Sequence, residues 1–169
     1  AEAVMLLNHQ AALDYVLNKP DYFRELTVQK NLEIHRFLTK GLGIPNKIRS
    51  GRVGITGTNY KPLAKANQIQ KALQDLCDLI NSKRNVLEKA FIALLLIAYI
   101  QPFEDGNKRT ARIICNALLL PNKYCPISFR TVEPEDYRYA TLLFYEQNSI
   151  PSFKKIFMEQ LEFSTANYF

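Results

Sequence analysis

Three cationic side chains crowd the predicted start of one helix. Lys108, Arg109 and Arg112 follow closely after Gly106, and the two arginines are three residues apart, so they share a helical face. A helix N-terminus already carries unpaired N–H groups and partial positive charge, so cations there cost stability unless an anion joins them. A phosphate would satisfy the N–H groups and the side chains together. The spacing therefore predicts a phosphate-binding turn, which Gly106 lets the anion approach closely.

Two acidic residues just before this turn leave two interpretations open. Asp105 could hold a Mg²⁺ ion that bridges phosphate oxygens. Alternatively, Glu104 and Asp105 neutralise the cations as a solvated cap with no ligand, and spacing alone favours neither. The segment 101–112 is neither a GxxxxGK[ST] phosphate loop nor a GxGxxG dinucleotide turn.

The elements that must position this turn are predicted to be helices. The helix that precedes it is apolar on all sides in its second half, which is typical of a helix surrounded by others. Pro102 ends that helix at Gln101. Apolar residues at helical spacing predict helices over 2–18, 27–40, 64–81, 84–100, 107–120, 134–147 and 151–166.

One segment departs from helical spacing. Between residues 48 and 62, Val53 and Ile55 alternate with small or polar residues and are flanked by glycines. This pattern predicts a short β-hairpin or extended flap, the single β element of the chain.

Composition limits the remaining classes of protein. The 169 residues are 47% hydrophobic and 22% charged, which is typical of one globular domain. No apolar run is long enough to span a bilayer, so no membrane partner is expected.

The three cysteines form no CxxC pair and indicate reduced thiols in a cytoplasmic protein. The net charge of +6 is scattered, so anionic ligands such as nucleotides are favoured over nucleic acid.

The stretch Gln101–Arg112 resembles the Fic family motif HxFx(D/E)GN(G/K)RxxR and departs from it at the first position. The likeness extends to Asn8-His9, to Glu33-Ile-His35, to the flap and to residues 144–160. It therefore covers nearly the whole chain, which we interpret as a single Fic domain over residues 1–169.

The resemblance implies an all-α Fic-type helical bundle with one short β-hairpin flap. Family members mostly transfer AMP from ATP to a hydroxyl side chain of a target protein, so ATP and Mg²⁺ are the implied cofactors. Asp105 would bind the metal, and Gly106, Asn107, Lys108, Arg109 and Arg112 would bind the nucleotide. Gln101, Asn107 and Arg109 stand at the catalytic positions, and the flap residues Val53, Gly54, Ile55 and Thr56 would dock the target.

Gln101 is the departure with the greatest consequence, because the family has its general base, a histidine, at that position. An amide cannot accept a proton near neutral pH, and loss of a general base removes about 10²- to 10⁴-fold in rate. Neither His9 nor His35 is an obvious substitute, and both are expected to have packing or surface roles. The chain is thus expected to be an impaired adenylyltransferase or a nucleotide-binding pseudoenzyme, with Gln101 either natural or engineered.

Two smaller departures remain. Lys108 takes the variable position of the motif as it does in Doc toxins, so a Doc-like protein kinase is kept as an alternative. No inhibitory (S/T)xxxE(G/N) motif occurs, and the chain opens without Met, so we expect an N-terminally truncated fragment with any inhibitory segment upstream. The sequence leaves open whether the chain forms a homo-oligomer.

Overall fold

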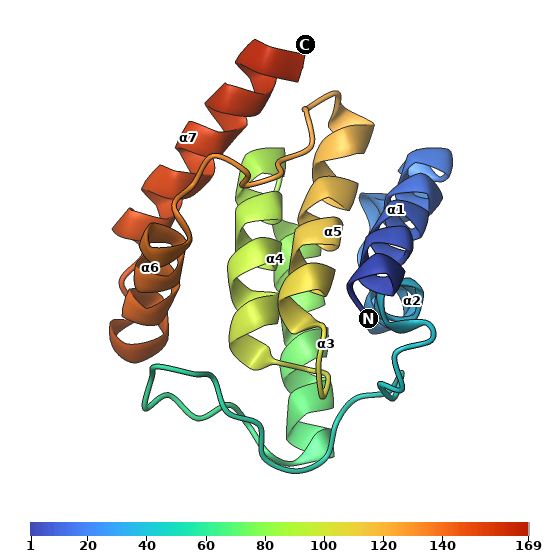
Figure 1. Ribbon diagram of the computed structural model, residues 1–169, viewed down its shortest axis with the longest axis vertical. Coiled ribbons are helices and arrows are strands. Elements are labelled where there is room, and N and C mark those ends of the chain that lie inside the picture. The colour runs from blue at the N-terminus through green and yellow to red at the C-terminus, as the bar shows by residue number, and fades with distance from the viewer. Residues whose placement is uncertain (169) are drawn as a thin grey trace.

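The computed structural model describes residues 1–168 and is a helical bundle in that range (Figure 1). Seven α-helices and two short 3₁₀ segments account for its regular structure, and no β-strand forms among these residues. The elements are α1 (Glu2–Asn18), η1 (Pro20–Arg24), α2 (Val28–Thr39), α3 (Ala66–Ser82), α4 (Val86–Ile100), α5 (Asn107–Leu119), η2 (Leu120–Asn122), α6 (Pro134–Gln147) and α7 (Pro151–Tyr168). The seven helices predicted from apolar spacing are therefore confirmed.

The antiparallel pair α4 and α5 lies at the centre of the bundle (Figure 1). Helices α1 and α2 pack on one side of α5, and α3 packs on α4. On the other side, Phe153 and Phe157 of α7 contact the ring of Phe91 in α4, with centroid separations of 5.7 and 5.3 Å. The predicted central position of the helix over 84–100 is confirmed, and its end meets the start of α5 at one end of the bundle.

Helix boundaries follow local capping. The Thr27 Oγ1 atom accepts a hydrogen bond from Lys30 N at the start of α2, and Asn85 Oδ1 accepts one from Glu88 N at the start of α4. The end of α2 is bonded to α1, because Asn8 Nδ2 of α1 donates to the carbonyls of Leu38 and Lys40. This contact fixes α1 against α2, next to the start of α5.

The predicted hairpin is not confirmed. The chain between α2 and α3 is a long irregular connection that runs across the end of the bundle where α4 meets α5 (Figure 1). A single backbone hydrogen bond, from Gly51 N to Ala64 O, joins its two arms, and a ladder needs several such bonds. Side chains hold the arms instead: Tyr60 Oη donates to Tyr99 O. We keep the word flap for residues 48–62.

The structure also bears on the cysteines and on the apolar helices. Cys77, Cys115 and Cys125 are buried and free of disulfides, and burial raises the pKa of the Cys77 thiol to about 12. Within residues 1–168, no helix has the length and hydropathy needed to cross a membrane.

Candidate functional site

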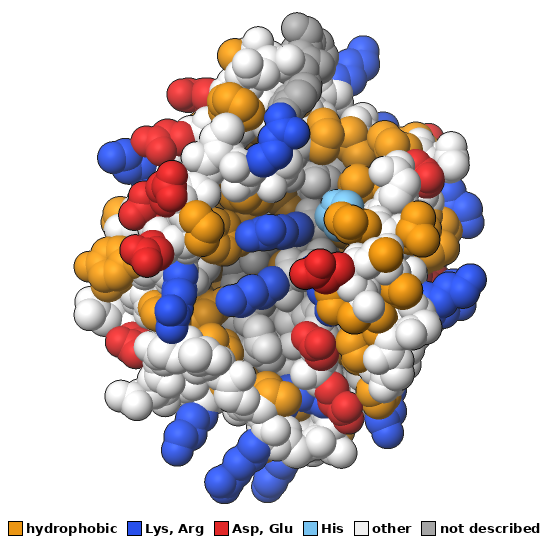
Figure 2. Space-filling model, in the orientation of Figure 1, with side chains coloured by type: hydrophobic (Ala, Val, Ile, Leu, Met, Phe, Trp, Pro, Cys, Tyr) orange, Lys and Arg blue, Asp and Glu red, His pale blue; other side chains and the backbone are white. Residues whose placement is uncertain are grey.

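The residues singled out from the sequence line one cleft of about 760 Å³ at the end of the bundle. Its walls are the flap, the loop 101–106, the first turns of α5 and one face of α6. Figure 2 shows that lysine and arginine side chains gather across the hollow on this face of the molecule. The predicted site residues found in the cleft are Val53, Gly54, Ile55, Thr56, Gln101, Asp105, Gly106, Asn107, Lys108, Arg109 and Arg112.

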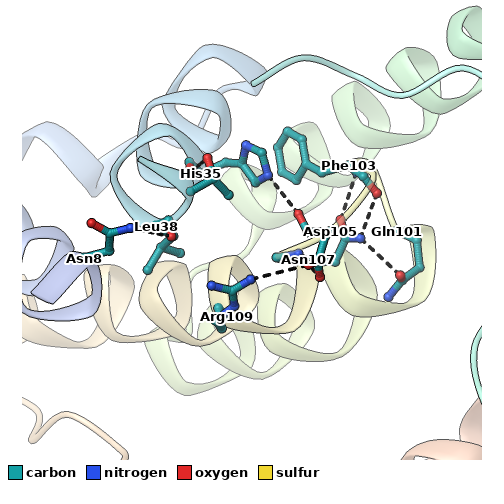
Figure 3. Close-up of polar contacts among 10 residues, drawn as sticks. Asn8, His35, Leu38, Gln101, Phe103, Asp105, Asn107 and Arg109 are labelled. Carbon is teal, nitrogen blue, oxygen red and sulfur yellow. Dashed lines mark hydrogen bonds and ion pairs between the residues drawn. The ribbon is translucent and has the colours of Figure 1, made fainter. Parts of the chain in front are cut away.

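The loop between α4 and α5 is closed by one asparagine side chain (Figure 3). Asn107 Oδ1 accepts a hydrogen bond from Phe103 N, and Asn107 Nδ2 donates to Phe103 O, each over 2.9 Å. The same Nδ2 atom also donates to Gln101 Oε1 at 3.1 Å. Because Asn107 is 4% exposed, these bonds are shielded from water, and they fix the loop before any ligand binds.

A buried histidine holds the loop from the other side. The His35 ring stacks on the Phe103 ring with centroids 3.8 Å apart and an angle of 14°. Its Nδ1 atom accepts a hydrogen bond from Asn46 Nδ2, so Nε2 carries the proton and donates to Asp105 O at 2.9 Å. Burial lowers the pKa of His35, which favours this neutral form. The packing role expected of His35 is therefore joined by a positioning role that the sequence did not indicate.

Gly106 stands at the N-cap of α5 with φ of +85°. A Cβ at this position would make ordinary van der Waals contact, 3.4 Å from Thr39 Cγ2 and 3.5 Å from His35 Cδ2, so the backbone geometry is what favours glycine. The first turn of α5 contains no acidic residue and no side-chain cap. The N–H groups of Asn107, Lys108 and Arg109 have no acceptor inside the helix, and all three residues line the cleft.

The charge of the cleft is strongly unbalanced. Five cationic side chains line it (Lys108, Arg109, Arg112, Arg130 and Arg138) against two carboxylates (Glu104 and Asp105). Asp105 Oδ2 lies 3.8 Å from Arg109 Nη2, too long for a hydrogen bond. The solvated cap considered from the sequence would therefore neutralise only a small part of this charge.

Two guanidinium atoms are buried without a hydrogen-bond partner among the described residues: Arg109 Nη1 and Arg112 Nε. The Arg112 guanidinium also packs over the rings of Phe129 and Tyr137, at 5.4 and 4.9 Å from their centroids. The pKa of Lys108 is lowered, first by desolvation and then by the charges of Arg112 and Arg138. An unpaired buried donor costs about 1–3 kcal/mol, which a bound anion would recover.

Gln101 is the C-cap of α4 and has left-handed backbone geometry with φ of +53°. Its Nε2 donates to Ala98 O at 2.6 Å, while its Oε1 accepts from Asn107 Nδ2. Both ends of the amide are thus bound within the protein. Arg49, which is fully buried, donates to the carbonyls of Ile100 and Gln101 and fixes the end of α4.

Asp105 is the single candidate metal ligand from the sequence. Its Oδ1 accepts from Gly106 N at 2.7 Å, and its side chain is 67% exposed, so the carboxylate is open to solvent at the cleft. Among residues 1–168, no group of three or more His, Cys, Asp or Glu could enclose a metal ion. One carboxylate with phosphate oxygens and water is a common arrangement for Mg²⁺, so the donor set fits a metal that arrives with a phosphate ligand.

Sequence reasoning missed the α6 wall of the cleft. Tyr137, Arg138, Thr141, Leu142 and Tyr145 line it, and their spacing places them on one helical face. That face was a detectable signal, but its position across the cleft from α5 depends on tertiary structure.

The family model for the Fic/DOC family matches residues 25–119. This is more than half of the chain, and it includes the loop 101–106 and α5. The chain therefore belongs to the Fic/DOC family.

Known proteins of similar sequence and structure agree with that assignment. The protein adenylyltransferase fic-1 of Caenorhabditis elegans is 25% identical over 151 residues, which cover 85% of this chain and 29% of the relative. The solved structure of C. elegans Fic-1 (residues 134–508) superposes with a TM-score of 0.82 at 21% identity, covering 98% of this chain and 50% of that one. BepC from Bartonella tribocorum, solved with bound AMPPNP, has a TM-score of 0.66 at 17% identity, covering 90% of this chain and 85% of that one. The chain thus spans less than a third of the curated relative and half of its solved structure.

Proposed function

We propose that the cleft binds the phosphates of ATP and that the domain is a protein adenylyltransferase, impaired by Gln101. One observation carries the proposal: Arg109 Nη1 and Arg112 Nε are buried and unpaired in a cleft with five cations and two carboxylates. Such an arrangement is stable when an anion supplies the missing acceptors. The adenylyltransferase relatives favour a nucleoside triphosphate over inorganic phosphate.

In the proposed reaction, the oxygen of a target hydroxyl attacks the α-phosphorus of ATP. The bond from that phosphorus to the oxygen that bridges to the β-phosphate breaks, pyrophosphate leaves, and the hydroxyl proton passes to solvent because Gln101 cannot accept it. The N–H groups of Asn107 and Lys108 and the guanidinium groups of Arg109 and Arg112 hold the phosphates and stabilise the developing charge. A Mg²⁺ ion on Asp105 would supply further charge neutralisation at the phosphate oxygens.

The flap would bring the target to the nucleotide. The main chain of Val53–Thr56 makes no hydrogen bond within the part of the chain that the structure describes, and it lines the cleft. A free main-chain edge can pair with an extended peptide. We therefore propose that the segment with the target hydroxyl binds along residues 53–56, on the same cleft as the start of α5.

Gln101 leaves the attacking hydroxyl without a base. Its amide has no basicity near neutral pH, and both of its ends are bound to Ala98 and Asn107. This second observation favours a nucleotide-binding pseudoenzyme as the alternative function. A Doc-like kinase, which would use Lys108, stays the minority alternative.

Labelled ATP separates the three functions. We expect Gln101→His to transfer label from [α-³²P]ATP to a protein acceptor in lysate, or to the domain itself, at least about 10²-fold faster than the unmodified chain. Transfer of γ-label would instead indicate a kinase. Binding with neither transfer in the histidine variant would indicate a pseudoenzyme and would remove the adenylyltransferase proposal.

A further inference from the structure

Arg138 of α6 contacts the tip of the flap. Gly57 has φ of +88°, and a Cβ added there would overlap Arg138 Nη2 and lie 3.3 Å from its Cζ. The guanidinium group therefore occupies the space that a side chain at position 57 would need. Nearby, Asn59 N donates to Glu146 Oε1 at 3.4 Å. Both contacts bring the flap tip against α6.

The position of the flap depends on these contacts. The two ends of the flap are bonded to the end of α4: Arg49 Nε donates to Gln101 O, and Tyr60 Oη donates to Tyr99 O at 2.8 Å. Between these ends, the main chain of Val53–Thr56 has no hydrogen-bond partner in residues 1–168. The side chain of Ile55 packs on the hydrophobic core, and the contacts of Gly57 with Arg138 and of Asn59 with Glu146 hold the flap tip against α6.

The same arginine belongs to the cleft. Arg138 lines it, opposite the start of α5, and its charge acts on Lys108 together with that of Arg112. With no anion present, these three cations repel one another. A polyphosphate would attract all three cations and hold Arg138 in the position where it contacts Gly57.

We propose that Arg138 is a positioning residue that couples the flap to the charge in the cleft: bound phosphates hold Arg138, and Arg138 holds residues 53–56 at docking distance. This inference rests on the proposed nucleotide site. It predicts that nucleotide binding orders the flap, so that the target is docked after ATP. A ligand stabilises the ordered flap over the disordered flap only through contacts that differ between these two states. Here the differing contact is that of the Arg138 guanidinium with the phosphates.

Hydrogen exchange of the flap amides tests this coupling. We would compare the unmodified chain with Arg138→Met, which keeps an unbranched apolar stem and removes the guanidinium group with its charge, and with Arg138→Lys, which keeps the charge. Arg84→Met is the matched control, because Arg84 is an exposed cation just before α4, at the opposite end of that helix from the cleft. Each protein is measured alone and with millimolar ATP and Mg²⁺.

We expect ATP to slow exchange of amides 52–60 by at least about tenfold in the unmodified chain and in Arg84→Met. In Arg138→Met the flap should exchange faster without ligand and gain no protection from ATP, and Arg138→Lys should regain part of it. Equal thermal midpoints show that the fold is intact. Equal flap exchange in the unmodified chain and Arg138→Met would overturn the inference.

The design also separates this inference from the proposed function. If ATP protects the first turn of α5 but not the flap, the nucleotide site stands and the coupling is wrong. If ATP protects neither segment, the nucleotide site is wrong and the coupling falls with it. The comparison without ligand then still shows whether Arg138 fixes the flap tip.

Discussion

The imidazole ring of His35 lies flat on the ring of Phe103, with 3.8 Å between centroids. Both side chains are fully buried, and His35 Nε2 also donates to Asp105 O. One helix near the N-terminus thus holds the loop that precedes α5, 70 residues further along the chain. The geometry of the cleft depends on this contact.

Replacing His35 should therefore loosen the loop and destabilise the fold. We expect His35→Ala to lower the free energy of unfolding by about 2–4 kcal/mol, because it leaves a cavity and unpairs Asp105 O and Asn46 Nδ2. Urea denaturation measures the change. His9→Ala is the control, since His9 is exposed and its loss should cost within about 0.5 kcal/mol. Equal effects at the two histidines would contradict the positioning role.

The lowered pKa of His35 makes stability depend on pH. Burial shifts this pKa below 6.5 in the folded protein, so the unfolded chain takes up the proton first as the pH falls. The free energy of unfolding should therefore decrease as the pH drops below about 6.5, by at most about 1.4 kcal/mol per pH unit for one group. His9, whose pKa is also lowered, adds in the same direction.

Urea titrations between pH 5 and 7.5 test this dependence. His9→Ala should retain the part due to His35, whereas a His35→Gln variant should lose it. A His35→Gln protein with the full pH dependence of the unmodified chain would assign the effect to other groups.

Gly106→Ala should destabilise the fold through its backbone geometry. The added Cβ would make only ordinary van der Waals contact with Thr39 and His35, at 3.4–3.5 Å, but it would stand in a residue with φ of +85°, so we expect a loss of about 1–3 kcal/mol in unfolding free energy. Gly43→Ala is a matched control, because Gly43 has φ of +71° and no atom within 4 Å of an added Cβ. Calorimetry should find similar losses in the two variants. A much larger loss in Gly106→Ala would show that the contacts with Thr39 and His35 also cost stability.

The two motif arginines should account for much of the nucleotide affinity. Arg109→Gln and Arg112→Gln each remove a charged donor, and we expect ATP affinity to fall about 10- to 100-fold in each, since charge-assisted hydrogen bonds contribute about 1.5–3 kcal/mol. Isothermal titration calorimetry measures the affinity. Arg84→Gln makes the same change in net charge away from the cleft and should leave the affinity within about twofold. Unchanged binding in both motif variants would refute the placement of the phosphates.

The sequence by itself determined the local structure of this protein. Apolar spacing predicted the seven helices, and the cations after Gly106 predicted a candidate anion site, because helix periodicity and turn geometry depend on neighbours within a few residues. The reciprocal hydrogen bonds between Asn107 and Phe103 are of this kind, since the two residues are four apart.

Tertiary structure decided what surrounds that turn. The stacking of His35 on Phe103, the buried Arg49 at the end of α4, and the α6 wall with Arg138 join segments far apart in the chain. Alternation around Val53 predicted a hairpin, whereas the flap's own Arg49 and Tyr60 side chains donate to carbonyls at the end of α4 and hold the flap as a loop. Such contacts follow from how the helices pack together, and no spacing within a single segment encodes them.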